Sequence, residues 1–263
     1  DVNRTGENYV AYLFAHNDGD GEFGPDGDAD VIKCGSYTGT GSSSSPPVIN
    51  LGFEPQWLMV KSATRAGQNW EMFDNMRGVS TGGITAELFP NTTSTERAAF
   101  NIINFTSTGF EASGVIDETN ENGQTYIYMA IRRGPLAPPE AGTEVFKPVL
   151  ATSTDAYSVG FETDFALFNK LAGLSFNTIA TTRLQGNSIR LSTATTAAET
   201  ASTNVVEFDL QDSFKQNILG SSSLIRYHWK RAPGYFDAVA YTGNSTAGRT
   251  VSHNLGVAPE MMW

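Results

Sequence analysis

The sequence has 263 residues and a formal net charge of −11. So acidic a chain lacks the basic face that nucleic-acid binding requires, and we expect no nucleic-acid partner. No apolar run is long enough to cross a bilayer, so we expect no membrane insertion. The single cysteine, Cys34, excludes an internal disulfide framework.

The first segment, residues 1–16, has the pattern of a strand that ends a module. Its Gly6-(x2)-Tyr9-Val10 matches Gly123-(x2)-Tyr126-Ile127, which opens an aromatic, apolar run later in the chain. We therefore expect residues 1–16 to be the last strand of a preceding module.

The next segment, residues 17–32, is an acidic insertion. Its carboxylates recur at alternate positions in two sets around Gly24-Pro25: Asp18, Asp20, Glu22, Asp26, Asp28 and Asp30. Calcium takes about six to eight oxygen ligands from a turning backbone, so the pattern predicts a Ca²⁺ site built from these six side chains. A solvated acidic loop is the alternative, because the spacing departs from that of a helix-loop-helix calcium loop.

Residues 33–134 alternate short apolar runs with turn residues. Segments 56–61, 69–74 and 126–131 are rich in β-branched, aromatic and alternating residues, and no stretch sustains a helical period. This pattern predicts an all-β module, an antiparallel, jelly-roll-like β-sandwich. Residues 135–145, with three prolines, are predicted to be an extended linker.

Residues 146–234 are predicted to be a second, related β-sandwich module. Gly52-Phe53-Glu54 recurs 108 residues later as Gly160-Phe161-Glu162, and the segment 131–135 recurs 98 residues later as 229–233. Self-similarity of this kind is typical of tandem arrays. We expect Leu88 to superpose on Leu191 and Glu96 on Glu199.

The last segment, residues 235–263, is predicted to start a third module. Tyr37-Thr38-Gly39 returns as Tyr241-Thr242-Gly243, and Asn50-Leu51-Gly52 returns as Asn254-Leu255-Gly256, both at an offset of 204. We therefore expect the chain to be part of a longer array. Such arrays are more often scaffolds or adhesins than enzymes.

Taken together, the motifs resemble those of tandem-repeat structural proteins of the tail-fibre type from tailed phages of marine bacteria. The segments that carry the resemblance spread over nearly the whole chain: 9–16, 34–39, 51–57, 74–78, 125–133, 231–237 and 253–260. The resemblance implies a virion component of fibre, spike or tail-tip type, located in the virion or outside the cell. It implies other virion proteins or copies of itself as partners, a homo-oligomer, and contact with the host surface.

One carboxylate pattern raises the possibility of catalysis. Glu207, Asp209 and Asp212 lie on one predicted strand in an arrangement close to that of some sandwich glycoside hydrolases, in which two carboxylates flank a sugar bond. The corresponding positions of the first module are Asn104, Thr106 and Gly109, none of them acidic, which favours a solvent-facing strand.

The remaining ionisable residues give no catalytic set. His16, His228 and His253 are isolated and are expected to be packed or surface residues. The basic pairs Arg132-Arg133 and Lys230-Arg231 recur at strand ends, where we expect them to cap a turn or bridge to the neighbouring module, with anion binding as the alternative.

Aromatic residues are the candidates for sugar binding. Trp70 and Tyr235 are possible glycan contacts, whereas Trp57 is expected to be buried because Phe165 and Met261 occupy its repeat positions. The sequence as a whole predicts a non-enzymatic structural and adhesive protein of a phage virion. A carbohydrate-active enzyme and a bacterial surface adhesin are the alternatives.

Overall fold

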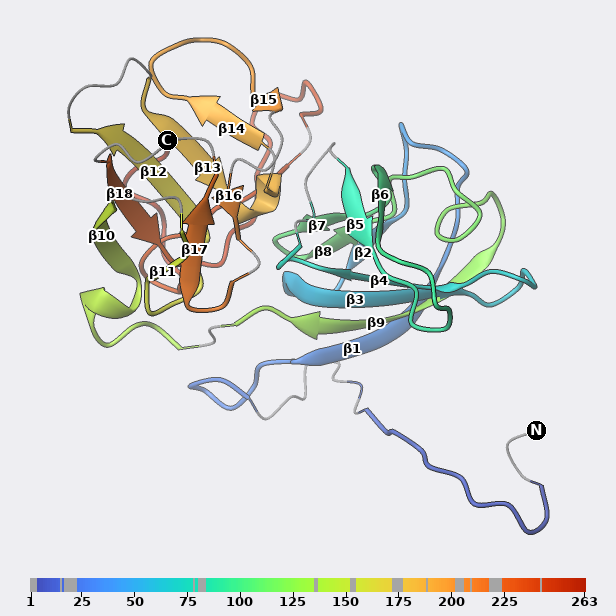
Figure 1. Ribbon diagram of the computed structural model, residues 1–263. Helices are drawn as coiled ribbons and strands as arrows, with labels where there is room; N and C mark the ends of the chain where they lie inside the picture. Colours follow the sequence, from blue (N-terminus) through green and yellow to red (C-terminus); the bar gives the residue numbers. More distant parts are fainter. Residues whose placement is uncertain are drawn as a thin grey trace.

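The short alternating segments form antiparallel β-sheets throughout the chain, which confirms the all-β prediction (Figure 1). This computed structural model describes the chain except for residues 1–3, 15, 17–22, 78, 80–83, 135–136, 152–154, 172–176, 188, 202–205, 209, 218–223 and 242, and the side chains of residues 151 and 170. Two groups of strands lie side by side, and we call them the first module and the second module.

The strands of the first module are β1 (Ile32–Thr38), β2 (Val48–Asn50), β3 (Pro55–Ser62), β4 (Trp70–Asp74), β5 (Thr85–Glu87), β6 (Arg97–Phe100), β7 (Asn104–Thr106), β8 (Gly109–Glu111) and β9 (Thr125–Arg132). One sheet has the order β1-β9-β3-β4, and a bridge between Met72 and Leu88 attaches the β5-β6 pair to its β4 edge. A second sheet has the order β2-β8-β7.

The strands of the second module are β10 (Phe146–Ala151), β11 (Tyr157–Ser158), β12 (Phe165–Lys170), β13 (Ile179–Thr182), β14 (Ile189–Ser192), β15 (Thr200–Ala201), β16 (Val206–Glu207), β17 (Ser213–Gln216) and β18 (Leu224–Trp229). Two short 3₁₀ helices, η1 (Gly142–Glu144) and η2 (Arg183–Gln185), precede β10 and follow β13. The sheets have the orders β10-β18-β12-β13-β14-β15 and β11-β17-β16.

The two modules have the same connectivity. Each strand of the second module corresponds to the strand numbered nine lower in the first module. The order β10-β18-β12-β13-β14-β15 therefore corresponds to β1-β9-β3-β4 extended to β5 and β6 by the Met72–Leu88 bridge, and β11-β17-β16 corresponds to β2-β8-β7. Each core lies between the larger and the smaller sheet. It is formed by residues such as Leu58, Phe73 and Phe110 in the first module and by Phe168, Phe208 and Phe214 in the second.

The strand registers agree with the repeat offsets seen in the sequence. Leu88 lies opposite Met72, and Leu191 lies opposite Ala180, the residue 108 positions after Met72. The register therefore places Leu88 and Leu191 at equivalent points, as predicted. Glu96 and Glu199 also occupy equivalent positions. Glu96 immediately precedes β6 and Glu199 immediately precedes β15, and these two strands form the same edge of the larger sheet in their modules.

The same tight turn follows β2 and β11. The backbone N–H groups of Leu51 and Gly52 both donate to the Thr108 carbonyl, at 2.7 and 3.1 Å. Val159 and Gly160 donate in the same way to the Asp212 carbonyl, both at 2.8 Å. Gly52 and Gly160 have φ values of 77° and 90°, a region that glycine adopts without steric cost.

The described parts of the terminal segments form no strands. Residues 4–7 form a turn, and the residues that follow it up to residue 14 expose their apolar side chains: Tyr12 and Leu13 are 82% and 91% exposed. A strand needs a paired neighbour, and no neighbour lies beside this segment in the described chain (Figure 1). Residues 235–263 instead pack beside the second module, where the rings of Phe236 and Trp263 both lie near that of Phe165.

The outer face of the larger sheet in the first module carries a row of apolar and sulfur-containing side chains. Tyr126 and Ala130 of β9 point into the core, so Ile127 and Met129 lie on the opposite face. Paired residues on that face form a row across β1, β9, β3 and β4, which we call the sulfur row: Cys34, Met129, Met59 and Met72. Open antiparallel sheets usually present polar residues on this side.

Candidate functional site: an ionic junction and its cavity

Buried charged residues connect the two modules. Asp164, which immediately precedes β12, is fully buried. Its carboxylate accepts a hydrogen bond from Arg133 Nη2 of the first module at 2.5 Å and another from the backbone N–H of Arg231 at 2.7 Å. Arg133 directly follows β9 and Arg231 follows β18, so equivalent residues of the two modules converge on one carboxylate.

Two further contacts cross between the modules. Arg231 Nη1 donates to Glu54 Oε2 of the first module at 2.7 Å. Arg183, in the 3₁₀ helix η2, donates through Nη1 to Met76 Sδ of the first module at 3.3 Å. Its Nη2 donates within the second module, to the Thr163 carbonyl at 2.7 Å. We call Glu54, Arg133, Asp164, Arg183 and Arg231 the ionic junction. Of the two roles expected for the recurring basic pairs, capping a turn or bridging to the neighbouring module, Arg133 and Arg231 take the second.

Burial and charge pairing set the ionisation of this junction. Burial raises the pKa of Glu54, and the attraction of Arg231 and Arg133 only partly offsets it. Burial also opposes ionisation of Asp164, but Arg133, Arg231 and Arg183 outweigh it and hold the pKa of Asp164 well below its usual range. Burial lowers the pKa of Arg231, and Glu54 and Asp164 reverse that effect, so its pKa is raised. The junction is therefore a set of mutually stabilised charges.

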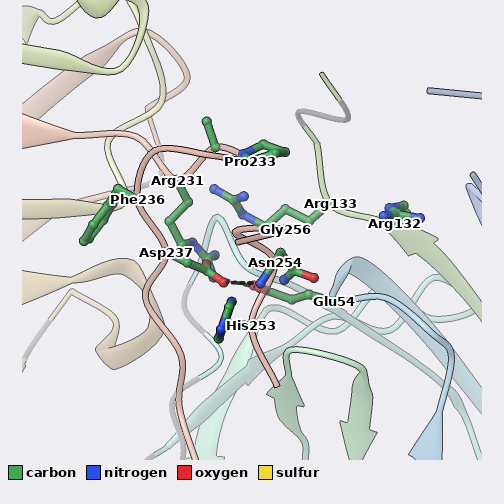
Figure 2. Close-up of a pocket in the computed structure, with 11 residues that line it drawn as sticks. Glu54, Arg132, Arg133, Arg231, Pro233, Phe236, Asp237, His253, Asn254 and Gly256 are labelled. Carbon is green, nitrogen blue, oxygen red and sulfur yellow. Dashed lines mark hydrogen bonds and ion pairs between the residues drawn. The ribbon is translucent and has the colours of Figure 1, made fainter. Parts of the chain in front are cut away.

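A cavity of about 250 Å³ opens beside the junction (Figure 2). Glu54, Arg133 and Arg231 form its floor, and the exposed residues His253 and Asn254 of the C-terminal segment lie at its mouth. The segment is held there by two hydrogen bonds. Gly234 N–H donates to the Leu255 carbonyl at 2.8 Å, and Asn254 N–H donates to Asp237 Oδ2 at 2.7 Å.

Several buried polar atoms at the floor have no hydrogen-bond partner among the described residues. Among them are Arg231 Nη2, Arg133 Nε and Glu54 Oε1; Arg231 Nε also has no hydrogen bond but lies 3.4 Å from Asp164 Oδ1. The side chain of Arg231 is only 2% exposed. Buried polar groups are almost always hydrogen-bonded, so a cavity with two free donors and one free acceptor suits a polar ligand.

The residues predicted to bind calcium are only partly described. Asp18, Asp20 and Glu22 lie outside the described residues. Asp26 and Asp28 belong to a small loop closed by a bridge between Phe23 and Ala29, and Asp30 lies 3.9 Å from the Lys33 ammonium. The described residues contain no group of three potential metal ligands. Calcium binding stays a prediction that titration calorimetry with CaCl₂ would test.

The structure separates the two predicted glycan contacts. Trp70 lies on the outer face of β4, beside the sulfur row, and is half-buried. Tyr235 is 39% exposed and lies in the turn between Ala232 and Phe236, next to the cavity. Trp57 was expected in the core but is only half-buried, because its strand position faces outward while the neighbouring Leu58 faces inward.

The acidic pattern near the end of the second module forms no carboxylate pair in the described residues. Glu207 is paired with the Lys215 ammonium at 2.7 Å, and this hydrogen bond lowers the pKa of Glu207. Asp212 lies in a turn, where its backbone carbonyl accepts hydrogen bonds from the N–H groups of Val159 and Gly160. Asp209 lies outside the described residues. Of the three isolated histidines, His228 is buried, whereas His16 and His253 are exposed.

Sequence reasoning missed a buried acid pair in the first module. Glu71 on β4 and Glu87 on β5 are both fully buried, and Arg97 forms an ion pair with Glu87. Burial, together with the neighbouring Glu87 carboxylate, raises the pKa of Glu71 to about 9. Glu71 is therefore protonated at neutral pH and can donate a hydrogen bond to Glu87.

Comparisons with known proteins assign the chain to a family. A model of the domain of unknown function DUF7483 matches residues 1–135, just over half of the 263 residues. No curated protein and no solved structure matches the chain. None of the helices in the described part of the chain has the length and apolar character that a bilayer crossing needs. The matched range contains the N-terminal segment, the acidic segment and the first module, and the chain belongs to the DUF7483 family.

Proposed function

We propose that the chain is a non-enzymatic structural and adhesive component of a phage virion, of the fibre, spike or tail-tip type, in which like modules are joined end to end. The observation that carries this proposal is the ionic junction between two modules of the same connectivity. Buried charge pairs have strict geometry, so they favour one relative orientation of the modules. A component that must hold its shape outside a cell would use such a joint.

The rigidity of the joint can be tested by small-angle X-ray scattering. The unaltered chain should scatter as one body with a single interdomain distance. Arg133→Gln removes the guanidinium that reaches Asp164 from the first module, and it should broaden the distance distribution while circular dichroism stays unchanged. Arg65→Gln, which removes two ion pairs within the first module, is the matched control and should leave the scattering unchanged. A flexible unaltered chain would contradict the proposal.

The adhesive part of the proposal needs a binding assay. A glycan array should show retention of at least one class of surface polysaccharide, and incubation with the retained polysaccharide should give no shorter products. Turnover that is lost in the double variant Glu207→Gln with Asp209→Asn would instead favour the alternative of a glycoside hydrolase. Localisation in the virion can be tested by labelling purified phage particles with an antibody against the chain.

A further inference from the structure

The cavity beside the ionic junction has the size and polarity of a small-ligand site. Pockets for drug-sized ligands measure roughly 300–1,000 Å³, so a cavity of about 250 Å³ suits a single sugar ring or a small acid. Exposure increases from the floor outward: Arg231 is buried, Arg133 is intermediate, and Asn254 is exposed. The cavity therefore has a charged floor and a solvent-accessible mouth.

The free polar atoms of the floor define what such a ligand must carry. Arg231 Nη2 and Arg133 Nε are N–H donors that need acceptors, and guanidinium groups pair best with carboxylates. Glu54 Oε1 needs a donor such as a hydroxyl group. A simple carboxylate such as acetate would satisfy the arginines but carries no hydroxyl group that could donate to Glu54.

An apolar wall completes the site. Phe236 and Pro233, which belong to the same turn, are among the residues that line the cavity (Figure 2). The C–H faces of sugar rings pack against such surfaces, whereas a fully charged ion gains nothing from them. The ligand that meets all three conditions has a carboxylate, hydroxyl groups and an apolar face.

We propose that this cavity binds a uronic-acid residue of a surface polysaccharide, with the sugar carboxylate on Arg231 and Arg133 and a sugar hydroxyl donating to Glu54. The choice of a sugar rests on the proposed adhesive function. The site itself rests on the cavity and its buried polar atoms. It would give the junction a second role, because a bound sugar would contact both modules and the C-terminal segment at once.

Isothermal titration calorimetry with D-glucuronate and D-galacturonate tests the proposal. At least one of them should bind with a Kd at least tenfold lower than that of D-glucose, which lacks the carboxylate, and of acetate, which lacks the hydroxyls. Binding should also raise the melting temperature, because the ligand prefers the folded state. Equal binding of glucose and both uronates, or no heat with either uronate, would overturn the proposal and leave a cavity that holds only water.

Two variants locate the site. Asn254→Trp places a large ring at the exposed mouth without altering the floor, and it should weaken uronate binding at least tenfold. Arg133→Gln should do the same by removing a floor donor, and circular dichroism would show that the variant folds. Arg65→Gln is the matched control and should bind like the unaltered chain. Full binding by both test variants would place the sugar elsewhere.

The two proposals fail separately. A chain that binds uronate but scatters as two independently moving modules contradicts only the structural function. A rigid chain that binds no uronate contradicts only the sugar site.

Discussion

The two modules share their connectivity but bury different ionisable side chains in their larger sheets. In the first module, the larger sheet encloses the acid pair Glu71 and Glu87. In the second, the position equivalent to Glu71 is Ile179, and the buried ionisable side chains of the larger sheet include Arg226 and His228 on β18. Their equivalents on β9 are Tyr128 and Ala130.

Both modules have apolar core residues at equivalent positions. Phe53 and Phe161 follow the equivalent turns, and Phe110 and Phe214 occupy equivalent places on β8 and β17. Strand order is therefore set by where apolar side chains alternate and where turns fall, whereas a polar group in the core can be exchanged for a different one. The buried charges are not needed for the topology and instead distinguish how each module responds to pH.

The largest effect is expected from breaking the junction on the side of the second module. Arg231→Ala leaves Glu54 without its hydrogen bond and removes one guanidinium from Asp164, so unfolding free energy should fall by about 3–5 kcal/mol. The equivalent change in the first module, Arg133→Ala, should cost about 1–3 kcal/mol, because Arg231 and Arg183 still hold Asp164. Urea unfolding measures both. Equal losses would mean that the two arginines are interchangeable.

The acid pair should make the first module less stable as pH rises. The pKa of Glu71 in the folded state, about 9, lies above its ordinary value of 4.5, so its contribution is complete below pH 4.5 and is lost as pH approaches 9. Glu71→Gln keeps a donor toward Glu87 at every pH. It should stabilise the protein at pH 7 by about 3 kcal/mol, from about 1.4 kcal/mol per pH unit, and should have little effect at pH 4.

Urea unfolding at both pH values checks this expectation. Glu260→Gln, at an exposed carboxylate, is the control and should change stability at neither pH. If Glu71→Gln were destabilising at pH 7, the carboxylate form would be the one that the fold requires.

His228 should make the second module less stable as pH falls, the opposite of the pH dependence expected from Glu71. Burial and the nearby Arg226 charge lower the pKa of His228 to about 3, below its ordinary value of 6.5. Its contribution is therefore complete above pH 6.5 and is lost as pH falls toward 3. Between pH 6.5 and 4.5 the unaltered protein should lose about 2 kcal/mol through this group.

His228→Gln separates this effect from the titration of carboxylates. The glutamine amide can still reach the Tyr157 hydroxyl, which lies 2.9 Å from His228 Nε2, but it does not titrate. Thermal unfolding of the variant should depend less on pH in this window. If the melting temperature of the variant depended on pH as that of the unaltered protein does, other groups would be responsible for the loss of stability at acidic pH.

The smallest loss of stability is expected at the glycine turn that follows β2 in the first module and β11 in the second. Gly52→Ala and Gly160→Ala each force an L side chain into a left-handed conformation, which costs roughly 1–2 kcal/mol. A methyl group at either position meets no atom within 4 Å, so the cost comes from the backbone alone. Urea unfolding should show equal losses within about 0.5 kcal/mol. A clear inequality would indicate that the two turns differ despite their matching hydrogen bonds.

The internal repeats explain how much of the fold could be predicted. Two copies of one motif constrain each other, so Leu88 and Leu191 could be assigned to equivalent positions before any strand was located. The recurring arginines likewise pointed to a bridge between modules. Asp164, the carboxylate that these arginines contact, could not be predicted from the repeats, because the equivalent residue of the first module is Gln56.

The acid pair was hidden for a different reason. Glu71 and Glu87 are 16 residues apart in the sequence and meet only because the bridge between Met72 and Leu88 sets β5 beside β4. Glu71 also alternates with apolar residues on its strand, the pattern of a solvent-facing side chain. In fact Trp70 and Met72 face outward and Glu71 faces the core, because the apolar outer face inverts the usual alternation.

The sulfur row of the first module makes one face of the protein sensitive to oxidants. Oxidation of Met59, Met72 and Met129 to sulfoxides would convert an apolar stripe into a polar one. The core on the other side of the sheet contains none of these sulfur atoms. Peroxide would therefore change the polarity of this face and leave the buried core of the first module without an oxidised side chain.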